Sequence, residues 1–204
     1  MRRIEMTTSI RPGHTLLLDP ALAGKSLGLE VQEGLLKVWM DAEEACSWGQ
    51  SHHQAITLGF LQAGDHLPLE LQRRGWLHLQ ALTPVRLAEC ADPLPRAGQH
   101  SLHDWTLDLL LIRNLGEAEQ RLMALLQLLV QRLGQRVGPW YELPLCLTHA
   151  ELAELAGHTR VTVSKRMSAW RKRGWLLPGR SDGPGLRLAP ALVEGEELLE
   201  AVST

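Results

Sequence analysis

A cluster of cations and hydrogen-bond donors lies in the C-terminal half of the chain, within six consecutive positions. It combines a guanidinium, an ammonium group, two hydroxyls and an apolar side chain, at Arg160, Val161, Thr162, Ser164 and Lys165. An arginine fork pairs with two acceptors on one edge of guanine, an apolar side chain contacts the thymine methyl group, and hydroxyls bind bases or phosphates. This set of residue types in one short segment predicts recognition of DNA bases.

The segment around this cluster predicts two short helices joined by a glycine turn. Thr148 followed three residues later by Glu151 is a capping box, which fixes the start of the first helix. Gly157 supplies the permissive backbone at which that helix ends, and Thr159 is the expected cap of the second. The first helix carries a core-facing stripe at helical spacing: Leu152, Leu155 and Ala156.

Three further residues complete a helix-turn-helix. Small Ala153 lets the two helices approach closely, while Val163 and Trp170 are placed to pack inward. The second helix then offers its N-terminal end to the major groove of DNA. We expect it to end near Gly174.

Positive charge is concentrated on this segment. The whole chain of 204 residues has a formal net charge of −2, yet residues 148–187 hold eight Lys and Arg against three Asp and Glu. A locally positive face attracts the phosphate backbone even when the net charge is slightly negative. The coincidence of motif and charge favours a nucleic-acid interface over a merely solvated helix.

Residues 1–97 are predicted to be β-rich. Short apolar segments separated by turn formers indicate a sandwich or barrel. The expected strands are residues 15–18, 28–31, 35–40, 55–61, 77–82 and 85–88.

Helical periodicity begins after Pro93 and Pro95. Residues 102–112 form an apolar helix, a second helix spans 117–133, and residues 139–147 are expected to be extended. Beyond the helix-turn-helix, strands at 175–177 and 186–188 flank a turn-rich segment and predict the wing of a winged helix. Arg180 and Arg187 are expected to contact phosphates from this wing.

The chain resembles the Crp/Fnr superfamily of transcription regulators over nearly its full length. The most specific match is the segment from Leu147 to Leu176, and Arg160–Val163 is similar to the cyanobacterial branch of the family. The resemblance implies an α+β fold in three parts. These are a β-roll (jelly roll) like a cyclic-nucleotide-binding domain at 1–97, a dimerisation helix at 98–115 and a winged helix-turn-helix domain at 116–204.

Carried over residue by residue, the resemblance assigns roles within the recognition segment. Arg160 matches the arginine that reads guanine, whereas Val161 replaces a glutamate common in the family and is expected to contact a thymine methyl. Lys165 matches a second base-reading position, often arginine, and as lysine it keeps the charge but loses the fork.

The remaining expected DNA contacts are to phosphate groups and not to bases. Hydroxyl or backbone contacts to phosphate are implied at Thr148, Thr159 and Thr162, and His149 is a weaker candidate. His158 is a weaker candidate in the same sense, because capping or solvent exposure would account for either histidine. Arg166 stands where the family has an apolar residue, so its stem is expected to pack while its guanidinium reaches a phosphate.

Two chains are expected to pair through the helix around Trp105. The residues that recur at helical spacing there are Leu102, Trp105, Leu109 and Ile112. The alternative is that this stripe is buried within one chain against the β-domain.

The sensor region departs from the cyclic-nucleotide-binding pattern. The family carries Gly-Glu-Leu and, after a short loop, Arg-Ser or Arg-Thr, to hold ribose and cyclic phosphate. Here Pro68 stands near the glycine position, and Arg73 and Arg74 are followed by neither Ser nor Thr. Control by cyclic AMP is therefore not expected, because a phosphate site depends on backbone amides and a paired arginine.

Two rival functions remain open at this point. A cupin-like metal enzyme with a DNA-binding appendage would use His52, His53, His66 and His78, but adjacent histidines on a strand point to opposite faces. The other rival is a DNA-binding regulator without a ligand, whose β-domain is a protein-interaction module. We expect no metal and no cofactor, because no catalytic or cluster-binding arrangement is present. The three cysteines, Cys46, Cys90 and Cys146, are expected to be small buried hydrophobes.

The sequence thus predicts a non-enzymatic, homodimeric regulator that binds an inverted-repeat site in double-stranded DNA. RNA polymerase and an unknown small-molecule effector are further candidate partners. The absence of a secretion signal or a long apolar segment predicts a cytoplasmic protein without a membrane partner.

Overall fold

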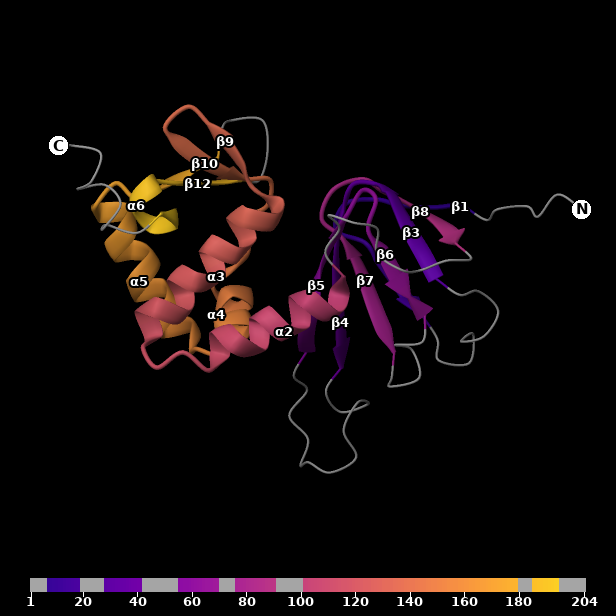
Figure 1. Cartoon of the computed structure of the whole chain (residues 1–204), viewed down its shortest axis with the longest axis horizontal. Helices are drawn as coiled ribbons and strands as arrows, with labels where there is room; N and C mark the ends of the chain where they lie inside the picture. Colours follow the sequence, from indigo (N-terminus) through magenta and orange to yellow (C-terminus); the bar gives the residue numbers. More distant parts are fainter. Residues whose placement is uncertain are drawn as a thin grey trace, which may run out of the picture. The chain divides into compact units, whose positions relative to one another are not determined.

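The computed structural model describes residues 7–18, 28–41, 55–69, 76–90, 101–179 and 185–194. The chain divides into two compact units, Met1–Asp108 and Leu109–Thr204, with the division inside helix α2 (Leu102–Arg113). Figure 1 shows strands in the first unit and mainly helices in the second. The expected boundaries at residues 97 and 115 stay a prediction.

The first unit contains two four-stranded antiparallel sheets. One has the order β1-β8-β3-β6, formed by β1 (Thr7–Ile10), β8 (Val85–Cys90), β3 (Gly28–Glu33) and β6 (His66–Pro68). The other has the order β2-β7-β4-β5, formed by β2 (Thr15–Leu18), β7 (Leu77–Ala81), β4 (Leu35–Asp41) and β5 (Ala55–Gln62). All six strands that we expected are present, and β1 and β6 were missed.

The two sheets share one hydrophobic core. Val31 and Leu87 of the first sheet are buried in the same cluster as Val38 and Leu79 of the second. Alternation along the strands produces this core, because every second side chain of a strand faces the same side. In β7, for example, the three buried residues alternate with two that are half-buried.

Gly59 lets helix α2 approach the second sheet. A Cβ atom at this position of β5 would lie 2.4 Å from Cβ of Trp105, well inside contact distance. The Trp105 ring is fully buried and meets Phe60 edge to face, with 5.3 Å between centroids. Thr106 Oγ1 also donates to the Leu58 carbonyl oxygen at 3.0 Å. The start of α2 is therefore seated on β5.

The second unit builds the helix-turn-helix on a longer helix. Its helices are α3 (Ala118–Leu133), α4 (His149–Ala156), α5 (Arg160–Lys172) and the short α6 (Pro190–Val193). Its sheet has the order β11-β12-β10-β9, formed by β11 (Leu176–Pro178), β12 (Leu186–Leu188), β10 (Trp140–Leu143) and β9 (Gln135–Val137). The expected wing hairpin is confirmed, since β11 and β12 pair antiparallel. Strand β9 and helix α6 were not expected.

Helix α3 supplies the core of this unit. Seven of its residues are buried, with Leu125 and Leu129 completely so, and α4, α5, α6 and β10 all pack against it. The buried residues include Leu122, Leu126, Leu129 and Leu133, which recur at helical spacing, and the expected second helix is confirmed. Among the helices that the structure describes, none is long and apolar enough to span a bilayer.

Candidate nucleic-acid interface

Helix α4 begins at the expected capping box. Thr148 Oγ1 accepts from the Glu151 backbone N–H at 3.2 Å, and Glu151 Oε2 accepts from the Thr148 backbone N–H at 2.9 Å. The hydroxyl of Thr148 also donates to Glu151 Oε2 at 2.9 Å. Because this hydroxyl is already used, a phosphate contact near Thr148 would have to displace its bond to Glu151.

The turn between the two helices follows from Gly157. This residue has φ +64° and ψ 47°, the left-handed conformation that glycine adopts without a steric penalty. The backbone N–H of His158 then bonds to the Ala153 carbonyl oxygen at 2.7 Å and closes the end of α4. The chain reverses within two residues, and Thr159 caps α5 by accepting from the Thr162 N–H at 3.2 Å.

Helix α5 has one buried face. Val163 and Trp170 have no exposed surface, and Met167 between them is 2% exposed. At about 3.6 residues per turn these three positions lie on one side of the helix. The expected inward packing of Val163 and Trp170 is confirmed, as is that of the α4 stripe.

The opposite face of α5 presents the predicted base-reading residues to solvent. Val161 is 63% exposed, and Lys165 lies on the same outward side one turn later. Arg160 is exposed on one flank of that side, beside half-buried Ser164. Most of the Val161 side chain is left uncovered by the described part of the protein, and an apolar group exposed beside cations favours contact with a partner.

His149 lies beside the same flank. Its pKa is lowered by partial burial and by the positive charges of Arg171 and Arg160. The two arginines disfavour protonation of His149 because they make this edge of the helix-turn-helix positively charged. A positively charged edge attracts the phosphate backbone of DNA.

The start of α3 holds α5 through one carboxylate. Glu119 Oε2 accepts from Arg166 Nη1 at 2.6 Å, and Glu119 Oε1 accepts from Trp170 Nε1 at 3.3 Å. The Arg166 side chain is 45% exposed, and its guanidinium pairs with Glu119. The expected phosphate contact of Arg166 stays a prediction.

His158 anchors the turn between α4 and α5. His158 Nε2 is 2.9 Å from the Ala118 carbonyl oxygen, and its Nδ1 is 3.4 Å from Arg121 Nη2. These partners fit a neutral imidazole that donates from Nε2 and accepts at Nδ1. His158 therefore links the turn to the start of α3 through these two contacts.

The wing is partly described. Arg187 donates from Nε to the Pro178 carbonyl oxygen at 3.0 Å, and its guanidinium lies 5.8 Å from the Trp140 ring centroid. These contacts fix its stem across the hairpin. Arg180 lies outside the described residues.

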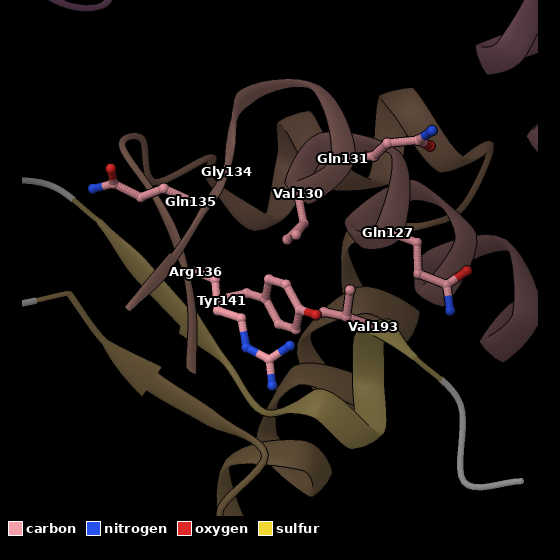
Figure 2. A pocket seen from close by; sticks show the side chains of 8 residues that line it. All are labelled: Gln127, Val130, Gln131, Gly134, Gln135, Arg136, Tyr141 and Val193. Atoms are coloured by element: carbon pink, nitrogen blue, oxygen red, sulfur yellow. The ribbon is translucent and has the colours of Figure 1, made fainter. Parts of the chain in front are cut away.

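A hollow of about 510 Å³ lies on the second unit, between α3, β9, β10 and α6. Figure 2 shows Tyr141 at its centre, with Arg136 and Val193 close to the ring. Tyr141 donates its hydroxyl to Glu194 Oε1 at 2.5 Å, and this bond together with burial raises the pKa of the phenol. Arg136 pairs with the same carboxylate at 3.6 Å. Tyr141 and Arg136 thus share the Glu194 carboxylate as a partner, and neither α4 nor α5 lines the hollow.

The proposed dimer stripe needs a correction. Leu102, Trp105, Leu109 and Ile112 are between 1% and 7% exposed in the single chain, so they leave no surface for a second copy. The exposed apolar residues of this region are Leu107, Leu110 and Leu111, at 46% to 57%, and Leu115 at 40%. The sequence periodicity identified the apolar face of α2 that is buried within the chain. The helix has a second apolar face, which is exposed.

Two of the four histidines of the cupin-like alternative are described. His66 lies on β6 of one sheet, and His78 lies on β7 of the other, where it stacks on Trp39 with 3.6 Å between centroids. His52 and His53 lie outside the described residues. Within the part of the chain that the structure describes, no group of three or more His, Cys, Asp or Glu side chains is arranged to hold a metal.

The cysteine expectation is wrong for one residue. Cys146 is exposed, Cys90 is half-buried, and Cys46 lies outside the described residues.

Comparisons with known proteins agree with both halves of this architecture. Residues 120–188 match the Crp-like helix-turn-helix domain, and residues 8–101 match the cyanobacterial CRP family N-terminal domain. The regulatory protein CysR of Synechococcus elongatus is 30% identical over 156 residues, which is 74% of this chain and 72% of CysR.

Solved structures share the fold. A CRP/FNR-family transcriptional regulator from Thermus thermophilus superposes with a TM-score of 0.61 at 21% identity, over 98% of this chain and 99% of that one. A CooA mutant from Carboxydothermus hydrogenoformans gives 0.64 at 20% identity, over 98% and 88%.

A winged helix-turn-helix with an exposed, cationic second helix defines a DNA-binding transcription regulator. The chain belongs to the CRP/FNR family of transcriptional regulators, with the N-terminal domain of its cyanobacterial CRP members.

Two residues that hold the helix-turn-helix were missed from the sequence, namely Glu119, which bonds to α5, and Arg113, which bonds to the end of α4. Both act on partners more than 40 positions away along the chain. Local spacing carries no signal for such pairs. An exposed acidic residue in the first turn of a helix looks like a favourable dipole contact and nothing more.

Proposed function

We propose that the protein binds a two-fold symmetric DNA site as a homodimer, with the first half of α5 in the major groove. The observation that carries this proposal is the exposure of Arg160, Val161 and Lys165 on α5, opposite or beside a face that is buried in the protein core. A helix fits the width of that groove, and its N-terminal residues meet the base edges.

The base preferences follow from these side chains. Arg160 forms two hydrogen bonds to guanine, and Val161 packs on a thymine methyl group. Lys165 supplies a single flexible donor and therefore discriminates less sharply than an arginine at its place. The backbone N–H groups at the start of α5 face phosphate, because the Thr159 hydroxyl is engaged in capping.

The dimer contact proposed here is the exposed face of α2. Leu107, Leu110 and Leu111 fall on one side of the helix, and Leu115 follows just beyond its end. Large apolar side chains gathered in this way mark a protein-binding surface, and a second copy of the same helix supplies a matching apolar face.

Regulation by cyclic AMP is not part of the proposal. Pro68 forms part of strand β6, paired with Gly28, and contributes no backbone N–H where the family's binding element needs one. Gly64 and Asp65 serve the β5–β6 turn, in which the Asp65 carboxylate accepts from the Gln62 N–H at 2.9 Å. A regulator with another effector, or with none, fits these observations.

Selection of bound duplexes from a random pool tests the main proposal. We expect a consensus with two-fold symmetry and a guanine in each half-site. An asymmetric consensus would contradict the dimeric mode of binding, and no enrichment at low ionic strength would contradict DNA recognition itself.

Sedimentation velocity tests the dimer. The wild-type chain is expected to sediment as two copies, and the double variant Leu110→Asp/Leu111→Asp as one, because four buried charges oppose association. Leu17→Asp is the matched control, since Leu17 is a 46% exposed leucine of β2 outside the proposed contact. A dimer that survives the α2 double variant would place the contact elsewhere.

A further inference from the structure

One carboxylate reaches two residues of the recognition helix. Glu119, in the first turn of α3, accepts from the Arg166 guanidinium at 2.6 Å through one oxygen. Its other oxygen accepts from the indole N–H of Trp170 at 3.3 Å. Arg166 and Trp170 are one turn apart on α5, so Glu119 spans a full turn of that helix.

The two contacts differ in burial. Trp170 is completely buried, so its bond to Glu119 fixes how α5 sits on α3. The Arg166 and Glu119 side chains, by contrast, are 45% and 33% exposed. An ion pair this open to water adds little net stability, since both groups are well solvated apart. Arg166 can therefore exchange partners at small cost.

The flank on which Arg166 lies points toward a DNA backbone. With Val161 and Lys165 facing the bases, helical spacing puts Arg166 on the side of α5 shared with Thr162. An α-helix fills the major groove, so residues on its flanks meet the phosphates that border the groove. The side chain held by Glu119 is thus within reach of the anion that α5 is proposed to approach.

We propose that Glu119 is an internal competitor of DNA phosphate for Arg166 and thereby limits the affinity of the recognition helix without altering the bases it reads. This inference rests on the proposed function, because it needs α5 to enter the groove. The carboxylate mimics a phosphate in the free protein, and binding requires the guanidinium to leave one anion for the other. The Trp170 contact makes Glu119 a positioning residue as well.

Glu119→Gln separates the two contacts. The amide oxygen of glutamine still accepts from the Trp170 indole, so the seat of α5 is kept, while the charge that holds Arg166 is lost. Glu117→Gln is the matched control, because it removes an equal charge from the exposed N-cap of the same helix. Arg166→Ala and the double variant Glu119→Gln/Arg166→Ala complete a double-mutant cycle.

The readout is the dissociation constant for the selected duplex, measured by fluorescence anisotropy over a series of NaCl concentrations. Glu119→Gln is expected to bind about two- to fivefold more tightly per recognition helix, the range of an exposed ion pair. The slope of log K against log[salt] should stay as in wild type, because both proteins contact the same phosphate, whereas Arg166→Ala should flatten it by about 0.9 for each phosphate lost and so by about 1.8 in a dimer. Glu117→Gln should change the affinity by less than about twofold and leave the slope unchanged.

The cycle decides the outcome. If Arg166 carries the effect, Glu119→Gln/Arg166→Ala has the same affinity and slope as Arg166→Ala alone. A gain that persists without Arg166 would show a simple field effect of the carboxylate and would overturn the inference, as would a Glu119→Gln variant that behaves like Glu117→Gln. A wild-type chain that binds no duplex at low salt would overturn the proposed function. If the wild-type chain binds, the affinities of the variants test the role of Glu119 alone.

Discussion

Arg113 and Glu154 are joined twice, once through the backbone and once through the side chain. Arg113 Nη2 donates to the Glu154 carbonyl oxygen at 2.5 Å and to Glu154 Oε1 at 3.0 Å. Its Nε also donates to the Leu155 carbonyl oxygen at 3.2 Å. The last turn of α2 therefore supplies a cation and three donated bonds to the C-terminal end of α4, where helical carbonyls lack partners.

Replacing Arg113 should loosen the helix-turn-helix. Arg113→Ala is expected to lower the free energy of unfolding by about 1–3 kcal/mol, because charged donors to two carbonyls are lost. Arg113→Lys should recover only part of this, since lysine lacks the fork. Urea unfolding followed by far-UV circular dichroism measures both.

A control for Arg113 comes from a more exposed cation whose ion pair is longer. Arg136 is 60% exposed and pairs with Glu194 at 3.6 Å, so Arg136→Ala should cost less than about 1 kcal/mol. Equal losses in the Arg113 and Arg136 variants would mean that the α4 carbonyls gain nothing from Arg113.

The parts of the molecule that were predicted from sequence are those set by local spacing. Thr148 and Glu151 are three residues apart, so their reciprocal bonds follow from the helix start itself, and the Gly157 turn follows from one residue type. The inward residues of α5 followed from helical periodicity in the same way. Short strands such as β6, which ends in Pro68, carry too few alternating positions to be recognised.

The parts that were missed depend on tertiary contacts. Helix α2 has apolar side chains nearly all round, so periodicity could not distinguish Trp105, which packs on β5, from Leu110, which stays exposed. Glu119 and Arg166 are 47 residues apart, and only folding reveals that the arginine has a partner. Helical periodicity predicts that a face is apolar, but only the tertiary structure shows which element packs against that face.

Gly59 provides a test of how α2 is seated. Gly59→Ala places a methyl group 2.4 Å from Cβ of Trp105, which forces the ring or the helix to move. We expect a loss of about 1–3 kcal/mol in the free energy of unfolding, the usual cost of overpacking. Thermal unfolding measures the change in stability.

Gly116→Ala is the corresponding control. A Cβ atom at Gly116 meets no described atom within 4 Å, so this variant should stay within about 0.5 kcal/mol of wild type. If Gly59→Ala were equally harmless, the close approach of α2 to β5 would not be maintained in solution.

Arg160 should determine one base of each half-site. Arg160→Ala is expected to weaken binding by about 1–3 kcal/mol and to relax the preference at that base, because a two-bond contact to guanine is lost. Lys172→Ala removes an exposed cation from the last turn of the same helix and should weaken all sequences alike. Anisotropy titrations with single-base variants of the selected duplex separate the two results. A uniform loss in Arg160→Ala would assign this arginine to phosphate.

His158 should make the stability of the second unit depend on pH. Burial and the positive charge of Arg121 lower its pKa, and the hydrogen bond to the Ala118 carbonyl opposes them only in part. The folded chain therefore binds fewer protons than the unfolded chain below the ordinary histidine pKa of about 6.5. The contribution of the neutral His158 to stability is complete above that pH and is lost progressively as the pH falls toward the lowered value. His149 acts with the same sign, since its pKa is lowered as well.

Urea unfolding at a series of pH values between about 7.5 and 5 measures this dependence, within the range over which histidine titrates. The wild-type free energy of unfolding should fall toward the acidic end, and His158→Gln should flatten that fall while lowering stability at neutral pH. His149→Gln is the matched control, because it removes the other depressed histidine but leaves the turn intact. Protonated His158 would present a donor at Nδ1 to the guanidinium of Arg121, which itself can only donate. An acid-side slope that His158→Gln leaves unchanged would show that this imidazole stays bonded to Ala118 and Arg121 in both protonation states.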